Sequence, residues 1–285
     1  MNKPERKRQE DDRSDDDAIE ASRAPLLDHL SELRSRLMVS VGALVVAFVV
    51  CFFYQDQIFQ LLTDPFVRAM QEARLTGPHG AIRMINTDAF GFFITKMKAV
   101  LFAAIFVSFP IIAWQGYAFV APGLYKRERG AVLPFLMAAP VMFVLGAVFV
   151  YFVAMPFALV FAIQQQTTIQ SSAGQTIEIE YLPKVDEYVG LETTLVLAFG
   201  LFFQTPVLLA LLARIGIVSS KMLRATRRYA IVGIAAFSSL VTPPDILSMT
   251  LMMIPLYLVF EGSIWIVWLI ERTRTKQEPQ AALVQ

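Results

Sequence analysis

Residues 37–54, LMVSVGALVVAFVVCFFY, contain no charged side chain and directly follow a segment rich in arginine. As an α-helix, a run of this length extends roughly 27 Å, close to the ~30 Å thickness of the hydrocarbon core of a bilayer. Charged residues fill the long segment before the run, and no small-residue cleavage site follows it, which argues against a removable signal peptide. We therefore expect a helix that is retained as a membrane anchor.

The composition of the whole chain agrees with a membrane protein. Of its 285 residues, 56% are hydrophobic and 17% are charged, whereas about 25% of the residues in soluble domains are charged. The formal net charge is +1, but the charges concentrate at the two ends and in short loops, so their positions are more informative than their sum. A single cysteine, Cys51, excludes an intramolecular disulfide and a cysteine-based metal site.

Six apolar segments predict an all-α polytopic membrane protein with six transmembrane helices. They comprise residues 37–54, 92–117, 132–163, 191–213, 229–241 and 246–270. We expect Pro110 to break the second span, and Pro206, two residues after the polar Gln204, to kink the fourth. The fifth span has only about 13 residues, or roughly 20 Å of helix, which is short for a bilayer. Residues 55–91 and 164–190 are expected to be longer connections on one side of the membrane.

Basic residues predict the orientation of these spans. They gather before the first span, after the second, after the fourth and after the sixth, which alternation along the chain places on one side. The positive-inside rule assigns this side, and both ends of the chain, to the cytoplasm. We divide the chain into a charged tail with too few apolar residues to fold, residues 1–24, a membrane domain, residues 25–270, and a cytoplasmic C-terminal tail, residues 271–285.

A carboxylate stands among arginines on the helix that leads into the first span. Glu32 precedes Arg36 by four residues, so the simplest interpretation is an ion pair on one helix face, worth a few tenths of a kcal/mol. A second interpretation adds Glu128, an acid in the basic loop YKRERG. Two carboxylates on a basic rim would accept arginine guanidinium groups bidentately and so prefer arginine to lysine. Residue spacing alone leaves both interpretations open.

Polar side chains within the spans have structural and functional interpretations. Gln204 fits either a hydrogen bond between helices or the lining of a hydrated groove, and Glu261 fits a structural role near the cytoplasmic end of its span. Asp245, in TPPD between the fifth and sixth spans, is by default a helix N-cap. A solute carrier that uses Gln204 and Glu261 as a midplane site is therefore an alternative function, and a scaffold for membrane partners is a third.

Enzymatic motifs are absent from the sequence. It has two histidines, His29 and His79, and lacks the HExxH, GxSxG and phosphate-loop patterns. We therefore expect a protein that is not an enzyme and has no cofactor, no metal and no nucleic-acid partner.

Four motifs together resemble the TatC family, the multispanning subunit of the twin-arginine protein translocase. They are HLSELRSRL (29–37), WQGYAFVAPGLYKRERG (114–130), AFGLFFQTPVLLALLARIGIVS (198–219) and LVTPPDILSMTLMMIPLYLVFE (240–261). The resemblance covers residues 25–270, with the motifs in order. It implies a glove-shaped bundle with a concave face and short last helices, in the bacterial cytoplasmic (inner) membrane.

The resemblance also implies a function and partners. It implies a receptor that binds signal peptides with consecutive arginines at its cytoplasmic face, within a complex that exports folded proteins using the protonmotive force. TatB-like and TatA-like single-span subunits would dock on the fifth and sixth spans. Other copies of the chain and membrane lipids would be further partners.

Matching the motifs residue by residue implies a candidate site. The acids that hold the arginine pair match Glu32 and Glu128, and the supporting positions of this cytoplasmic site match Arg34, Phe119 and Lys126. On the outer side, the positions linked to translocation match Pro65, Tyr151 and Asp245.

One residue departs from the family pattern. Many members have a glutamate facing the concave surface where this chain has Gln204. An amide keeps polarity and hydrogen bonding there but carries no ionisable proton. A mechanism that needs a proton at this position is therefore not expected to operate through Gln204.

Overall fold

The computed structural model describes residues 30–72, 83–120, 129–164, 167–170, 176–179, 182–242 and 246–282. The first helix, Leu30–Phe53, turns at Tyr54 into a second one. The following helices are α2 (Gln55–Glu72), α3 (Gly91–Val120), α4 (Arg129–Phe149), the π-helix η3 (Val150–Ala154), α5 (Met155–Gln164), α6 (Val185–Phe202), α7 (Thr205–Arg214), α8 (Ser220–Ala225), α9 (Arg227–Val241) and α10 (Ile246–Ala282). Strands β1 (Thr167–Gln170) and β2 (Thr176–Ile179) form an antiparallel hairpin between α5 and α6.

Five of the described helical segments are long and apolar enough to cross a membrane. They are Leu30–Phe53, Gly91–Phe119, Pro134–Ile163, Val185–Arg214 and Ser248–Thr273. The predicted multi-pass helical membrane protein is confirmed. The predicted fifth span is α9, which has 15 residues and is as short as expected. The last helix is not short, because α10 continues past the predicted end at residue 270 to a total of 37 residues.

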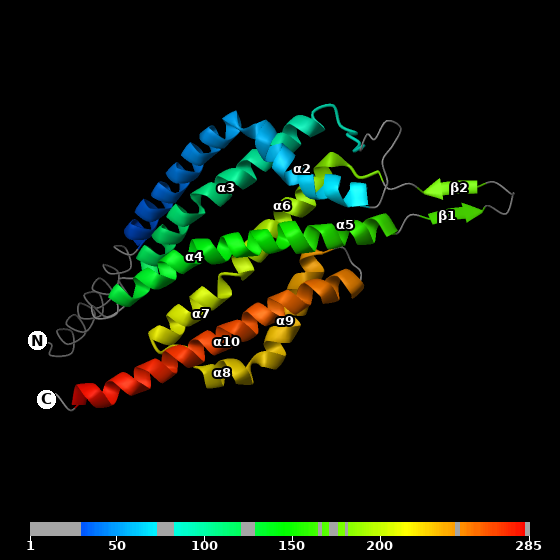
Figure 1. Cartoon of the computed structure of the whole chain (residues 1–285). Coiled ribbons are helices and arrows are strands. Elements are labelled where there is room, and N and C mark those ends of the chain that lie inside the picture. Colours follow the sequence, from blue (N-terminus) through cyan, green and yellow to red (C-terminus); the bar gives the residue numbers. More distant parts are fainter. Residues whose placement is uncertain are drawn as a thin grey trace, which may run out of the picture.

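The bundle has two chemically different ends (Figure 1). The start of the first helix, the end of α3, the start of α4 and the end of α10 lie at one end, which we call the basic end because arginine-rich stretches of the sequence adjoin these helix ends. The opposite end holds α2 and the β1–β2 hairpin, and we call it the hairpin end. Helix α6 packs against α3 and α4, while α10 packs against α7 and α9.

Proline affects the second and third spans less than the sequence suggests. The expected break at Pro110 is wrong, because α3 runs through this residue from Gly91 to Val120. A proline removes one backbone donor, and the rest of the helical ladder persists because apolar surroundings offer the backbone no other partners. In the third span, the π-helix η3 ends just before Pro156, where a wider turn accommodates the proline ring.

The fourth span breaks where the sequence predicts. Phe203 and Gln204 form a turn between α6 and α7, and Pro206 lies in the first turn of α7. Since Pro206 has no N–H, it cannot donate to the carbonyl of Phe202 four residues earlier. The Thr205 hydroxyl donates to that carbonyl instead, with an O···O distance of 2.6 Å.

Glycines allow α4 and α6 to approach closely. A Cβ atom added to Gly146 would lie 2.9 Å from the Cα of Gly200 and 2.9 Å from the carbonyl oxygen of Phe199. A Cβ added to Gly200 would lie 2.6 Å from the ring of Phe143. Small residues are typical of such contacts in membranes, where close backbone packing contributes to helix association.

Two acids of α10 bind its neighbours at the basic end. Glu271 accepts hydrogen bonds from the backbone N–H of Ser220, at 2.9 Å, and from the Ser220 hydroxyl. Glu261 pairs with Arg227 of α9 at 2.7 Å and accepts a hydrogen bond from Tyr257 at 2.8 Å. The structural role predicted for Glu261 is confirmed.

Candidate functional site

Glu32 lies in the first turn of the first helix and binds Arg36. The Nε and Nη2 atoms of Arg36 lie 3.0 and 2.5 Å from the Oε1 atom of Glu32, and the two side chains are 33% (Glu32) and 26% (Arg36) exposed. The simpler sequence interpretation, a pair four residues apart, is therefore confirmed. Both bonds reach Oε1, and a carboxylate has a second oxygen, Oε2, that can accept from a further donor.

The other residues of the predicted cytoplasmic site are only partly described. Arg34 is exposed on the first helix, and Phe119 is half-buried near the end of α3. Both belong to the basic end of the bundle (Figure 1). Lys126 and Glu128 fall between α3 and α4, outside the described residues, so their distance to Glu32 stays a prediction.

Two of the three predicted outer residues, Pro65 and Tyr151, lie in the described part of the chain. Pro65 is buried within α2, and Tyr151 lies on η3. The Tyr151 hydroxyl interacts electrostatically with Asp64 and Arg68, which flank Pro65 on α2. The third residue, Asp245, lies outside the described part of the chain.

Gln204 bonds to a neighbouring helix. Its Nε2 atom donates to the backbone carbonyl of Ala139 in α4, at 2.9 Å. The side chain is half-buried at the break between α6 and α7. The interpretation of Gln204 as a hydrogen bond between helices is confirmed.

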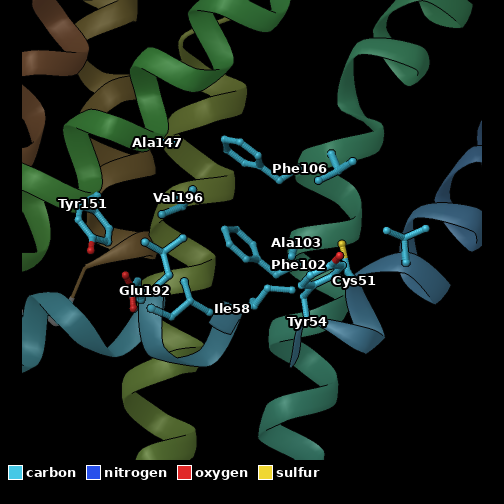
Figure 2. Close-up of a pocket in the computed structure, with 14 residues that line it drawn as sticks. Cys51, Tyr54, Ile58, Phe102, Ala103, Phe106, Ala147, Tyr151, Glu192 and Val196 are labelled. Carbon is cyan, nitrogen blue, oxygen red and sulfur yellow. The ribbon is translucent and has the colours of Figure 1, made fainter. Parts of the chain in front are cut away.

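A cavity of about 450 Å³ opens between the first helix, α2, α3 and α6, and Figure 2 shows the side chains around it. Most of them are aliphatic or aromatic. The cavity also reaches Cys51, Tyr54, Tyr151 and Glu192. Within the described residues, no three His, Cys, Asp or Glu side chains come together in a way that could hold a metal ion.

Sequence reasoning overlooked Glu192. This residue is 0% exposed, and neither of its carboxyl oxygens has a hydrogen-bond partner among the described residues. The available signal was an acid just inside the predicted fourth span, at a depth where ionisable side chains are rare and usually functional. Its meaning depends on the side chains that the fold places around it, which the sequence does not order in space.

Comparison with known proteins gives the family. The family model described as Sec-independent protein translocase protein (TatC) matches residues 28–255. The TatC protein of Magnetococcus marinus is 38% identical over 256 residues, covering 90% of this chain and 88% of its own. The TatC protein of Escherichia coli K12 is 33% identical over 255 residues, covering 89% and 92%.

A solved structure agrees with these relatives. The crystal structure of the twin-arginine translocase receptor TatC matches this fold with a TM-score of 0.69 and 29% sequence identity, over 85% of this chain and 99% of that one. The chain belongs to the TatC family of Sec-independent protein translocase proteins.

Proposed function

We propose that this chain is the receptor subunit of a twin-arginine translocase and that its basic end, on the cytoplasmic side, binds the paired arginines of signal peptides. In this proposal the chain crosses the membrane six times, with α9 as the short fifth crossing, and export uses the protonmotive force. The observation that carries the proposal is the position of Glu32. This acid lies at the same end of the bundle as the end of α3 and the start of α4 (Figure 1), the two helices between which Glu128 falls in the sequence.

The contact between Glu32 and Arg36 suits arginine recognition. Arg36 holds the carboxylate through Oε1, so an incoming guanidinium would be received by Oε2. An arginine of the peptide can add a bond to Oε2 or replace Arg36, since the two guanidinium groups have the same chemistry. Lysine, a point charge without the planar fork, matches this carboxylate less well.

The free-energy difference needed to prefer arginine over lysine requires both acids. A single exposed ion pair contributes about 0 to 1 kcal/mol, which is less than the ~1.4 kcal/mol that corresponds to a tenfold preference. Glu32 is one-third exposed and alone provides too little. A second carboxylate, Glu128, and partial desolvation at the headgroup layer would together supply the selectivity.

The carrier alternative is disfavoured by the bonds that its residues already make. Gln204 donates to the carbonyl of Ala139, and Glu261 is held by Arg227 and Tyr257. These bonds engage both carboxyl oxygens of Glu261 and one N–H of Gln204, so the proposed midplane site would have to compete with contacts that hold the helices together. Crosslinking of signal peptides separates a receptor from a scaffold that has no peptide site.

Single-span partners of the TatA and TatB type are proposed to dock on α9 and α10. Support comes from large apolar side chains that are exposed on both helices, including Val232 and Leu240 of α9 and Ile254 and Leu258 of α10. The short α9 would leave a thinner apolar surface there, next to which a single helix can pack. Further copies of the chain and lipids would cover other exposed apolar faces.

The test compares signal peptides with two arginines and with two lysines. Each peptide carries a photocrosslinker next to the pair, and crosslinking to the full chain in membranes is measured. In the double variant Glu32→Ala/Glu128→Ala, the preference for the arginine peptide is expected to fall by tenfold or more, which corresponds to a loss of ~1.4 kcal/mol or more of binding free energy. Membrane insertion is expected to stay unchanged.

A matched control separates site loss from general charge loss. Glu187→Ala removes an exposed acid that pairs with Lys184 at the start of α6, at the hairpin end, and is expected to keep the preference. A double variant that still distinguishes the two peptides as the parent does refutes the proposal. A parent that binds neither peptide supports the scaffold instead.

A further inference from the structure

Glu192 is the most unusual side chain in the membrane-spanning part. It lies on α6, is 0% exposed and lines the cavity of about 450 Å³. Among the described residues, nothing hydrogen-bonds either carboxyl oxygen. Gln204 and Glu261, in contrast, have partners. Burial without a partner is costly for a carboxyl group unless it is neutral.

The groups around Glu192 suit the neutral acid. Tyr188, one turn earlier on α6, interacts with the carboxyl, but its hydroxyl proton is donated to the carbonyl of Leu62 at 2.9 Å. The tyrosine oxygen can therefore only accept from Glu192. A protonated acid has a proton to donate, whereas a carboxylate would face this oxygen with its own lone pairs.

No basic side chain lines the cavity to neutralise a carboxylate. Beyond Tyr188, the ionisable groups that face Glu192 are Tyr151 on η3 and, across the cavity, Cys51 and Tyr54 of the first helix. Helices α2, α3 and α4 contribute apolar side chains to this lining. Two charged residues of α2, Asp64 and Arg68, act on Tyr151.

We propose that Glu192 is a proton-binding site within the bundle and exchanges its proton with the hairpin end through Tyr151. Tyr151 interacts with Glu192 on one side and with Asp64 and Arg68 on the other, and Figure 2 shows its hydroxyl turned toward Glu192. Asp64 and Arg68 are exposed. The proton would pass between the tyrosine hydroxyl and the Asp64 carboxylate or water beside it, while Arg68 stays charged.

The π-helix explains how Tyr151 reaches this position. Tyr151 is part of η3, a wider turn within the third span at Val150–Ala154, so its side chain departs from the direction that a regular helix would give it. Such turns are frequent at functional sites. Here the turn places a hydroxyl between a buried acid and exposed charges.

Proton occupancy would decide what fills the cavity. With a proton, the lining is neutral and almost entirely apolar, so a lipid chain can occupy the space. Without it, a charge stands in an apolar cavity and draws in water or a cation. The exchange of one proton is thus coupled to the wetting of a cavity that lies beside α2 and α3.

Infrared spectroscopy of the full chain in lipid at neutral pH tests the proton itself. A protonated carboxyl has a carbonyl band that an ionised carboxylate lacks. We expect Glu192→Gln to lose such a band and Glu261→Gln to keep it, because Glu261 is ion-paired with Arg227. If the band is equal in the parent and in Glu192→Gln, Glu192 is ionised and the proposal is overturned.

Carbodiimide labelling of the unmodified parent is independent of how any variant folds. A hydrophobic carbodiimide reacts with protonated carboxyl groups in apolar surroundings. Mass spectrometry is expected to find the adduct on Glu192 and not on Glu261. The reverse pattern contradicts the assignment.

Hydrogen–deuterium exchange tests the proposed route through Tyr151. After transfer to D2O, the carbonyl band of protonated Glu192 shifts at the rate at which its proton is replaced by deuterium. Tyr151→Phe is expected to slow this exchange roughly tenfold or more, since a positioned acid–base group contributes about 10²- to 10⁴-fold to a proton transfer. Tyr54→Phe, which also removes a hydroxyl from the cavity lining, is the control and should leave the rate unchanged. Unchanged exchange in Tyr151→Phe refutes the route. These measurements use no signal peptide, so their outcome is separate from that of the receptor proposal.

Discussion

The close contact of α4 and α6 makes Gly146→Ala a severe change. The new Cβ would lie 2.9 Å from the Cα of Gly200 and from the carbonyl oxygen of Phe199, whereas non-bonded carbon atoms prefer about 3.5–4.0 Å. Both neighbours are backbone atoms, so no side chain can turn away, and the helices must separate. Overpacking a well-filled contact costs about 1–3 kcal/mol, and we expect the upper part of this range.

Alanine has the opposite effect where space is open. A Cβ at Gly190, which lies on α6 as Gly200 does, meets nothing within 4 Å. Replacing a helical glycine by alanine stabilises a helix by about 0.5–1 kcal/mol, so Gly190→Ala is the matched control. The two substitutions should therefore differ by roughly 3 kcal/mol. By the scaling for chains of this size, about 2–4 °C per kcal/mol, their melting temperatures should differ by roughly 6–12 °C.

Thermal unfolding in one detergent, followed by circular dichroism, measures this difference. Gly200→Ala provides an internal check, because the group it meets is the Phe143 ring at 2.6 Å, a side chain that can be shortened. Adding Phe143→Leu is expected to recover part of the stability lost in Gly200→Ala and none of that lost in Gly146→Ala. The packing argument is refuted if Gly146→Ala melts at or above the temperature of Gly190→Ala.

Two further predictions concern polar groups in the fourth span. Gln204→Glu loses the donor to the Ala139 carbonyl unless the new acid is protonated, so stability is expected to fall by about 1–3 kcal/mol and to fall further as the pH rises; unfolding temperatures at two pH values test this, and equal values contradict it. Thr205→Val leaves the Phe202 carbonyl without the hydroxyl that replaces the missing N–H of Pro206 and should cost about 0.6 kcal/mol, the average for such bonds in membranes. The same change in a Pro206→Ala background should cost less, because a backbone donor is restored, and a double-mutant cycle by chemical unfolding detects the difference or its absence.

Local signals were enough to predict much of the fold. The apolar run at residues 37–54 predicted a membrane helix, the length of the fifth segment predicted a short α9, and Pro206 predicted the break between α6 and α7. Each depends on residues that are close in sequence. The break expected at Pro110 was wrong, because one proline removes one bond and the continuous ladder around it persists.

Features that depend on distant residues were not predicted. Helix α2 and the β1–β2 hairpin lie in segments expected to be connections, and their patterns are too short or too polar to stand out from loops. The pair of Glu32 with Arg36 was predictable from a spacing of four residues. The surroundings of Glu192 were not, because Tyr151 comes from η3, and Leu62, which binds its neighbour Tyr188, comes from α2.

An acid at position 192 does not stabilise the fold. In the described residues, Glu192 and Ser238 contain the buried side-chain oxygens that lack a partner, and an unbonded hydroxyl costs far less than an unbonded carboxylate. An apolar side chain of similar size would fill the same space next to Tyr188 and Val196 without that cost. A residue that weakens the fold where it stands is expected at a functional site. Proton binding accounts both for the missing partners and for the hydroxyl of Tyr151 that leads toward the exposed charges of α2.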